Sequence, residues 1–173
     1  MPLDASRTGA AAALADILHQ RGIEVNVLIN NAGFGNVGSF GRLDADLVSQ
    51  ELAVNVTFLV ELTRALLPAM VARGQGAVLN VASLAAFQPV PGMAVYAAAK
   101  ACVLSFSLAL AREVRHQGVR VVALCPGTTR TGFFFRAGLA GWDAFGSGHS
   151  ASVVAREGLR AVERGRWWGC ATA

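Results

Sequence analysis

The sequence is poor in charged residues and contains almost no lysine or tyrosine. Only 15% of its 173 residues are charged, and Lys100 and Tyr96 are its single lysine and its single tyrosine. Hydrophobic residues make up 54% of the chain, which suits one compact domain and excludes a disordered or fibrous protein. The net charge of +4 comes from scattered arginines without a basic run, so we expect no nucleic-acid partner.

Patterns typical of metal sites, secretion and membrane spans are also missing. The three cysteines lack metal-ligand spacing, so we expect reduced thiols, no metal site and a cytoplasmic location. The start, "MPLDASRTGA", lacks the charged-then-apolar pattern of a signal peptide. Residues 74–99 carry no charge, but prolines, glycine and amides interrupt them, whereas a span needs about 20 mainly apolar residues. We therefore expect no membrane association.

Short apolar runs alternate with helical patterns along the chain. The periodicity predicts three helices and three strands, the helices over 8–21, 44–73 and 96–118 and the strands over 25–30, 76–83 and 119–127. This alternation predicts an α/β fold, in which a parallel sheet is covered by helices on both faces. Segment 132–150 is rich in glycine and aromatic residues, which is typical either of a lid over a site or of a poorly packed connection.

The predicted strands end in distinctive stretches. These are Asn30-Asn31-Ala32-Gly33, then Ala82-Ser83, then Pro126-Gly127-Thr128-Thr129. Ligands of parallel sheets bind beyond the carboxyl ends of the strands. We therefore expect these stretches to converge on one site together with Tyr96, which starts the next helix.

Tyr96 and Lys100 are four residues apart in "VYAAAK", and residues at this spacing share one face of a helix. A nearby ammonium favours the phenolate form and so lowers the pKa of a phenol. A fall of roughly two to three pKa units needs about 3–4 kcal/mol of differential stabilisation. The pair is thus predicted to form a general acid/base that works near neutral pH. The same spacing also occurs by chance in many helices.

Two further polar residues complete a candidate catalytic set. Ser83 follows a strand, where its hydroxyl can hydrogen-bond a substrate oxygen. Asn55 lies in the apolar helical run "LAVNVTF", where a buried amide needs partners, and it is predicted to hold a water that leads protons to Lys100. Taken singly, each has a plainer interpretation, as a turn residue and as a satisfied polar group of the core.

Together, these residues resemble the classical short-chain dehydrogenase/reductase family. The ordered set is Asn-Asn-Ala-Gly after a strand, Asn55, Ser83, Tyr-x-x-x-Lys, and Pro-Gly after the next strand, and it extends from about Asp4 to Arg166. The resemblance implies a Rossmann-like, doubly wound parallel sheet in a single NAD(P)-binding domain over 1–173. It also implies reversible hydride transfer between NAD(P)(H) and a carbonyl or secondary alcohol.

The resemblance implies a role for each matched residue. Tyr96 would exchange a proton with the substrate, Lys100 would lower the Tyr96 pKa and bind the nicotinamide ribose, and Ser83 would orient the substrate. Asn55 would complete the proton relay. The dinucleotide, with NADP slightly favoured over NAD, would contact Asp4, Asn31, Ala32, Gly33, Tyr96, Lys100, Pro126, Gly127, Thr129 and Thr131. Family members pair through such apolar helices, so we expect a homodimer or homotetramer.

Aromatic and apolar residues flank the predicted site. They are Phe87, Val90 and Met93 before the tyrosine, and Phe133, Phe134, Phe135 and Trp142 after Pro-Gly. Three consecutive phenylalanines cannot all point inward. This set predicts a hydrophobic ketone or secondary alcohol as substrate.

The beginning and the end of the chain depart from the family pattern. The family starts with a strand and a Thr-Gly-x-x-x-Gly-x-Gly turn that binds pyrophosphate, whereas "TGAAAAL" lacks the later glycines. We expect an N-terminally truncated domain that starts some sixty residues in, with strand 25–30 bare at its edge and no closing strand after residue 166. The alternative function is a catalytically silent fragment that at most pairs with family members.

Overall fold

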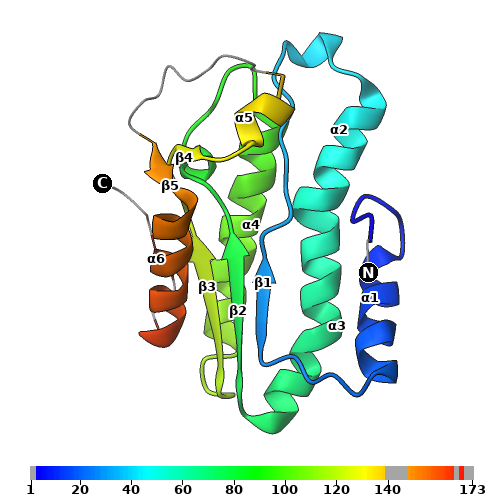
Figure 1. The fold of residues 1–173 in the computed structure, drawn as a ribbon, viewed down its shortest axis with the longest axis vertical. Coiled ribbons are helices and arrows are strands. Elements are labelled where there is room, and N and C mark those ends of the chain that lie inside the picture. The colour runs from blue at the N-terminus through cyan, green and yellow to red at the C-terminus, as the bar shows by residue number, and fades with distance from the viewer. Residues whose placement is uncertain (1–2, 139–147, 166–167, 170–173) are drawn as a thin grey trace.

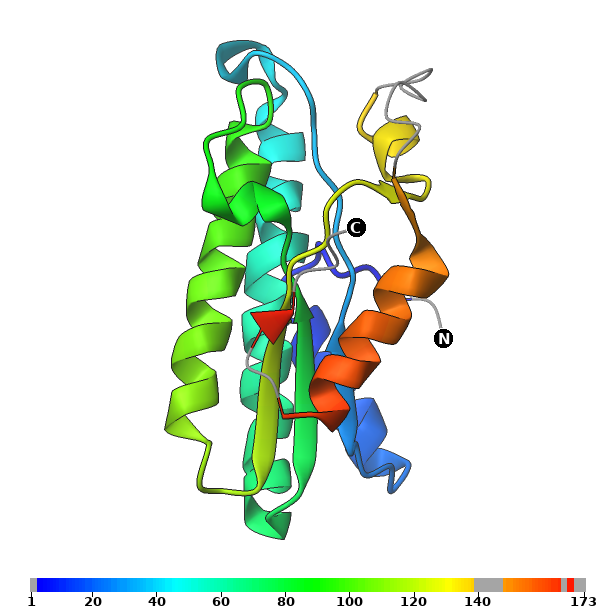
Figure 2. The same ribbon diagram turned by 90° about the vertical axis from the view of Figure 1, so that its left-hand side faces the viewer.

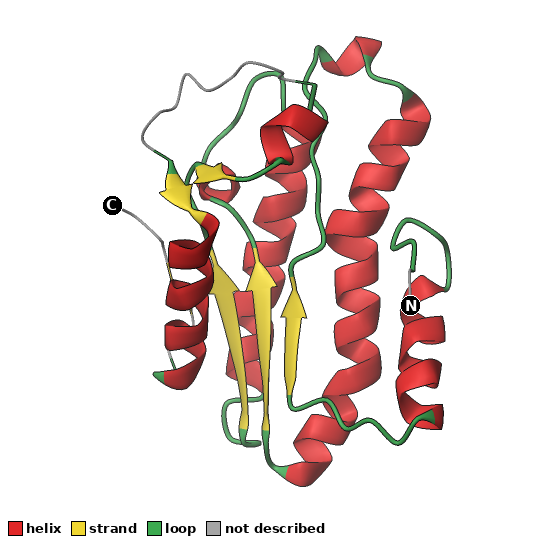
Figure 3. Ribbon diagram, in the orientation of Figure 1, coloured by secondary structure: helices red, strands yellow, loops and turns green. Residues whose placement is uncertain are grey.

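A computed structural model describes residues 3–138, 148–165 and 168–169. Figures 1 and 3 show strands that run side by side, with helices packed around them. In chain order, the elements are α1 (Ala10–Gln20), β1 (Val27–Asn30), a 3-10 turn (Phe40–Arg42), α2 (Ala45–Leu52), a π-helical turn (Ala53–Thr57), α3 (Phe58–Arg73), β2 (Gly76–Val81), a 3-10 turn (Leu84–Phe87), α4 (Ala94–Glu113), β3 (Val119–Leu124), β4 (Thr129–Arg130), α5 (Phe133–Arg136), β5 (His149–Ser150), α6 (Ala151–Glu163) and β6 (Trp168–Gly169).

The main sheet is parallel and has the strand order β1-β2-β3-β6. Asn30 of β1 pairs with Asn80 of β2, which pairs with Ala123 of β3, so these strands end at the same edge. The parallel sheet expected from the sequence is therefore confirmed. The expectation that no strand follows residue 166 is wrong, because the short β6 pairs with the end of β3.

Helices lie on both faces of the sheet, as expected (Figure 2). One face is covered by α3 and α4, and α6 covers β2 and β3 on the other face. Helix α1 packs against α3 rather than against the strands. Helix α6 was not expected from the sequence, where charged residues at Arg156, Glu157, Arg160 and Glu163 interrupt its apolar positions.

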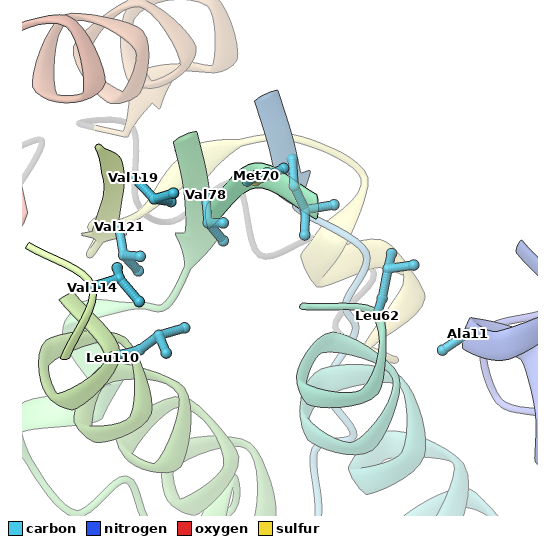
Figure 4. Packing of buried hydrophobic residues seen from close by; sticks show 9 residues of the cluster. Ala11, Leu62, Met70, Val78, Leu110, Val114, Val119 and Val121 are labelled. Atoms are coloured by element: carbon cyan, nitrogen blue, oxygen red, sulfur yellow. The ribbon is translucent and has the colours of Figure 1, made fainter. Parts of the chain in front are cut away.

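The largest core cluster lies between the sheet and the pair α3–α4 (Figure 4). Val78 and Val121 point from the strands toward Leu110 and Val114 of α4, and Met70 of α3 is fully buried beside them. A second cluster joins α6 to the opposite face. Because both faces of β2 and β3 are covered, these strands read as continuous apolar runs.

Strand β1 is less buried than the sequence predicts. Leu28 faces the α3–α4 side and is buried, but Val27 and Ile29 are 49% and 48% exposed. Within the described residues, β1 pairs only with β2, so its other edge is open, as expected. Helix α6 contacts mainly β2 and β3, so it leaves this face of β1 uncovered.

The predicted helix 44–73 is three consecutive pieces rather than one. Asp44 caps α2 with its carboxylate, which accepts hydrogen bonds from the backbone N–H groups of Asp46 and Leu47. A π-helical turn then widens the helix at Asn55, and α3 ends at Gly74 in the left-handed conformation. The stretch Ala45–Arg73 and helix α4 are both long and apolar enough to cross a membrane, a criterion that core helices of soluble proteins also meet.

Candidate active site

Tyr96 and Lys100 lie one turn apart at the start of α4, on the side that faces the end of β2. The Lys100 Nζ atom is 5.6 Å from the centre of the Tyr96 ring and donates a hydrogen bond of 2.9 Å to the carbonyl oxygen of Val81. The lysine side chain is only 5% exposed. An ammonium is thus buried next to the single phenol, as the spacing predicts.

Asn55 lies at the π-helical turn and reaches the loop that follows β1. Its Nδ2 atom donates to the carbonyl oxygens of Phe34, at 2.7 Å, and of Glu51, at 2.9 Å, whereas its buried Oδ1 atom has no partner. A Cβ atom at Gly33 would lie 2.7 Å from Asn55 Oδ1 and 3.3 Å from Lys100 Nζ. Both polar atoms therefore pack closely against Gly33, where there is no room for a side chain.

Ser83 lies two residues after the end of β2, beside the Tyr96 phenol, where its hydroxyl favours the phenolate. The Ser83 Oγ atom also accepts a hydrogen bond of 3.1 Å from the N–H of Ala85. The adjoining N–H of Leu84 donates to the carbonyl oxygen of Pro126 at 3.0 Å, so the Pro-Gly stretch lies next to the serine. The structure thus brings Asn55, Ser83, Tyr96 and Lys100 together.

The electrostatics of Tyr96 differ from the expectation. Burial raises the pKa of the Tyr96 phenol above its ordinary value of 10.0, Ser83 lowers it, and the negative charge of Glu51 raises it further. We expected the ammonium of Lys100 to lower this pKa, which is wrong for the chain without ligands. Lys100 is directed at the Val81 carbonyl, and desolvation of the phenolate outweighs any attraction.

Lys100 itself is perturbed in the direction that burial dictates. Desolvation lowers the pKa of its ammonium from 10.5 to about 8, against the charge of Glu51, which raises it. The side chain therefore titrates close to neutral pH. Perturbed groups of this kind gather at functional sites, because proton transfer needs pKa values near the working pH.

Apolar side chains converge over Gly35. A Cβ atom at Gly35 would lie about 3 Å from atoms of Met93, Tyr96 and Phe133, at 3.0, 3.0 and 3.1 Å. The Phe133 and Tyr96 rings are 5.1 Å apart between centroids and tilted by 53°. This part of the predicted apolar wall is therefore present beside the phenol.

The other members of the predicted wall are arranged differently. Phe134 packs edge-on against Phe133, while Phe135 is 75% exposed, so the three phenylalanines do point in different directions. Phe87 is also exposed, and Val90 is partly buried. Trp142 lies outside the described residues.

The remaining residues predicted to bind the dinucleotide lie at loops around this edge. Asn31 and Ala32 are exposed at the end of β1, and Gly127 and Thr129 follow β3, where the Thr129 hydroxyl donates to the Gly127 carbonyl at 3.0 Å. The Thr131 hydroxyl accepts a hydrogen bond from the N–H of Phe133.

Asp4 is farther along the same end of the fold. It lies in the turn before α1, which is level with the carboxyl ends of the strands in Figure 1. Its carboxylate accepts hydrogen bonds from the N–H and hydroxyl of Ser6, which hold the pKa of Asp4 below its ordinary value. Asp4 also lines a hollow of about 610 Å³ beside α1.

Two buried polar features were missed by sequence reasoning. Asn30 donates to Thr63 Oγ1 and Asn80 Oδ1, and Asn80 donates to Ser107 Oγ, which ties β1 and β2 to α3 and α4 below the site. The signal was an amide within the apolar strand "GAVLNV". The second feature is Glu51, a fully buried carboxylate in the run "SQELAVN", four residues before Asn55.

Comparison with known proteins places these residues in a family. The family model described as short chain dehydrogenase matches residues 1–137. The chain is 38% identical over 130 residues to 2-(S)-hydroxypropyl-CoM dehydrogenase 3 of Xanthobacter autotrophicus. The aligned region covers 75% of this chain and 48% of that protein. It is 40% identical over 101 residues to a protein of the same organism named inactive 2-(S)-hydroxypropyl-CoM dehydrogenase 2, over 58% of this chain and 44% of that protein. The chain thus spans about half the length of the curated relatives it matches.

Solved structures agree with the fold. A short-chain dehydrogenase from Sphingobium yanoikuyae in complex with NADPH superposes with a TM-score of 0.89 at 30% identity, over 97% of this chain and 65% of that one. The bulky-bulky ketone specific alcohol dehydrogenase from Comamonas testosteroni gives a TM-score of 0.86 at 25% identity, over 100% of this chain and 65% of that one.

Proposed function

Because the chain belongs to the short-chain dehydrogenase family, we propose that it carries the proton-transfer site of an NAD(P)-dependent enzyme that interconverts a carbonyl and a secondary alcohol. The observation that supports this most is the convergence of Asn55, Ser83, Tyr96 and Lys100 at one edge of the sheet. Each residue alone has a plainer interpretation. A buried lysine, a half-buried phenol and an unpartnered amide oxygen side by side are hard to explain by packing alone.

The residues present fit the nicotinamide end of such a cofactor. The Asn55 Oδ1 and Lys100 Nζ atoms both lie against Gly33 at the end of the sheet, and the Oδ1 atom has no partner among the described residues. Among the described residues, Lys100 donates one hydrogen bond, to Val81. An ammonium has three donors, so Lys100 can also hold ribose hydroxyls. When bound, NAD(P)H supplies the hydride that reduces a carbonyl carbon.

The protein's own part in the reaction is the movement of the proton. Because burial keeps the Tyr96 phenol protonated, its O–H can donate to the carbonyl oxygen as that oxygen gains negative charge. The Ser83 hydroxyl can donate a second hydrogen bond to the same oxygen. Lys100 and Asn55 would then return a proton to the phenolate from solvent, Asn55 by holding a water with its free Oδ1 atom.

The substrate is proposed to be a hydrophobic ketone or secondary alcohol. Met93 and Phe133 pack beside the phenol, and Phe87 and Phe135 are exposed nearby in sequence. Burial of apolar substrate surface against such side chains is favourable by about 25 cal/mol per Å². The ketone-specific enzyme of Comamonas testosteroni has a similar fold, which supports this class of substrate.

The test is NAD(P)H-dependent reduction of an apolar ketone by a version of the protein as long as its relatives. We expect Tyr96→Phe to lower kcat by roughly 10²–10⁴-fold, as is usual when a general acid is lost. Ser105→Ala is the matched control, because it also removes one hydroxyl from α4, at an exposed position. Activity of Tyr96→Phe within a few-fold of the parent would contradict the proposal, and so would faster turnover of a polyol than of any apolar ketone.

The alternative is a catalytically silent chain that pairs with family members. The relative named as inactive supports it, since a similar sequence exists without activity. Calorimetry with NADPH and NADH on the 173-residue chain separates the two. If no micromolar binding occurs while the chain remains folded by circular dichroism, the silent alternative holds for this polypeptide.

A homodimer or homotetramer is also proposed. In the stretch Ala45–Arg73 and in α4, only a minority of the most apolar window is buried within the chain. A second copy packed against these helices would cover that surface. Sedimentation that shows a stable monomer at micromolar concentration would contradict this proposal.

The location in the cytoplasm that the sequence indicates stays a prediction.

A further inference from the structure

Glu51 is a fully buried carboxylate, and no ion pair connects it to another of the residues that the structure describes. It lies near the end of α2 with 0% of its surface exposed. Its Oε2 atom accepts hydrogen bonds from the backbone N–H of Asn36, at 3.1 Å, and from Asn36 Nδ2, at 2.7 Å. Its Oε1 atom has no partner within the described part of the chain. A carboxylate is rarely buried unless it is paired, so its position calls for a reason beyond packing.

Glu51 is hydrogen-bonded to the loop that follows β1, which packs against Asn55, Lys100 and Tyr96. Asn36, which Glu51 holds, follows Gly33 and Gly35 in this loop, and Asn55 holds Phe34 of the same loop from the next helical turn. The carbonyl oxygen of Glu51 also accepts the Asn55 amide at 2.9 Å. The two side chains thus clamp one loop from successive turns of one helical stretch.

Glu51 also acts on both titratable groups of α4 that belong to the site. Its charge raises the pKa of Lys100 against the effect of burial, and it raises the pKa of Tyr96. In turn, burial raises the pKa of Glu51, while the bonds from Asn36 and the charge of Lys100 lower it. The groups that exchange charge effects here are therefore Glu51, Lys100 and Tyr96.

We propose that Glu51 is a positioning residue of the proton relay, whose carboxylate holds the loop after β1 against Asn55 and keeps Lys100 in its ammonium form. This rests on the proposed function, since the relay matters only if Tyr96 transfers a proton. A purely structural clamp would explain the bonds to Asn36. It would not require the charge of Glu51, which separates the two roles.

The experiment uses the fact that the chain has one lysine and one tyrosine. With ¹³Cε-lysine and ¹³Cζ-tyrosine labels, each side chain gives one NMR resonance, whose shift against pH reports its protonation. We compare the wild type with Glu51→Gln, which keeps the shape and removes the charge. Glu61→Gln, at an exposed position of α3, is the matched control.

We expect the Lys100 midpoint to lie at about 8 in the wild type and to fall by roughly half a unit or more in Glu51→Gln. The Tyr96 midpoint falls as well, because a neighbouring negative charge is gone. Glu61→Gln leaves both midpoints in place. Unmoved midpoints in a folded Glu51→Gln variant would overturn the proposal.

Two further measurements keep the test decisive if Glu51→Gln does not fold. In the wild type, the lysine and tyrosine resonances should both show a small step at acid pH, with a midpoint above the ordinary 4.5 of a glutamate, as Glu51 is protonated. Absence of this step would overturn the proposal. Asn36→Ala keeps the charge of Glu51 but removes one hydrogen bond to it. This variant should leave the Lys100 midpoint near that of the wild type and should speed amide exchange in residues 33–36. If the Lys100 midpoint instead falls as in Glu51→Gln, the effect comes from the loop contact and not from the charge, which contradicts the proposal.

These resonances do not depend on turnover, so they distinguish the two proposals. If Tyr96→Phe keeps its activity while Glu51→Gln shifts Lys100, the proposed function fails and the coupling stands. In an active protein, the coupling also predicts that Glu51→Gln moves the alkaline limb of kcat to lower pH. An alkaline limb unchanged in Glu51→Gln would contradict the role of the charge in the relay.

Discussion

Burial of the Lys100 ammonium should make the stability of the chain rise with pH above neutrality. The pKa of Lys100 is 10.5 in an exposed setting and about 8 in the folded chain. Between these two values the unfolded state binds more protons than the folded state, so the free energy of unfolding increases with pH. At 1.36 kcal/mol per pKa unit, the full difference is roughly 3 kcal/mol.

The increase in the free energy of unfolding that can be measured is smaller, because Tyr96 acts in the opposite direction at higher pH. The pKa of Tyr96 is raised above 10.0, so above that pH the folded state keeps a proton that the unfolded state loses, and stability falls. From about pH 7.5 to about pH 10, we therefore expect Lys100 to contribute a rise of about 2 kcal/mol.

Urea unfolding at a series of pH values measures this rise in the wild type and in Lys100→Met. All other titratable groups are the same in the two proteins, so the difference between the two curves isolates the lysine. Tyr96→Phe should keep the rise and lose the fall above pH 10. If the curves of the wild type and Lys100→Met run parallel, the ammonium is not buried in solution and the reasoning is wrong.

Three other substitutions test the packing around the site by urea unfolding. Gly33→Ala should cost about 1–3 kcal/mol, because the new Cβ atom would lie 2.7 Å from a buried amide oxygen, whereas Gly41→Ala, with open space, should cost little; equal effects would contradict this. Gly118 and Gly92 both have a positive φ, so an alanine at either position should cost about 1–2 kcal/mol. Gly118→Ala should destabilise more than Gly92→Ala, because only at Gly118 would the Cβ atom overlap a backbone carbonyl oxygen. Asn80→Leu removes two buried hydrogen bonds and should cost about 1–3 kcal/mol; a variant as stable as the parent would show that the network contributes nothing net.

The sequence was informative where a property depends on neighbours along the chain. Helical periodicity and the β-branched runs placed α1, α4 and the three main strands within about five residues, and the glycine after α3 placed the end of that helix. The spacing of Tyr96 and Lys100 placed both on one face of α4, because four residues make about one turn. The order of the motifs along the chain also indicated the family, because each motif follows the end of a particular strand.

The sequence did not determine how deeply each group is buried. Val27 and Ile29 are exposed because α6 contacts mainly β2 and β3. The sequence of the α6 segment has no clear apolar run, so this arrangement could not be predicted from it. The direction of the Tyr96 pKa was predicted wrongly for the same reason. A neighbouring ammonium is visible in the sequence, but the surface that removes water from the phenol comes from distant segments.

What the sequence by itself determined was therefore the main strands and most of the helices, the family and the identity of four converging side chains. Only the tertiary structure decided that Glu51 belongs beside them, that Asn30 and Asn80 join the sheet to its helices, and that Lys100 bonds to Val81. The physical reason is that local conformation depends on residues within one or two turns. Desolvation and charge interactions act through space, between segments that only the folded chain brings together.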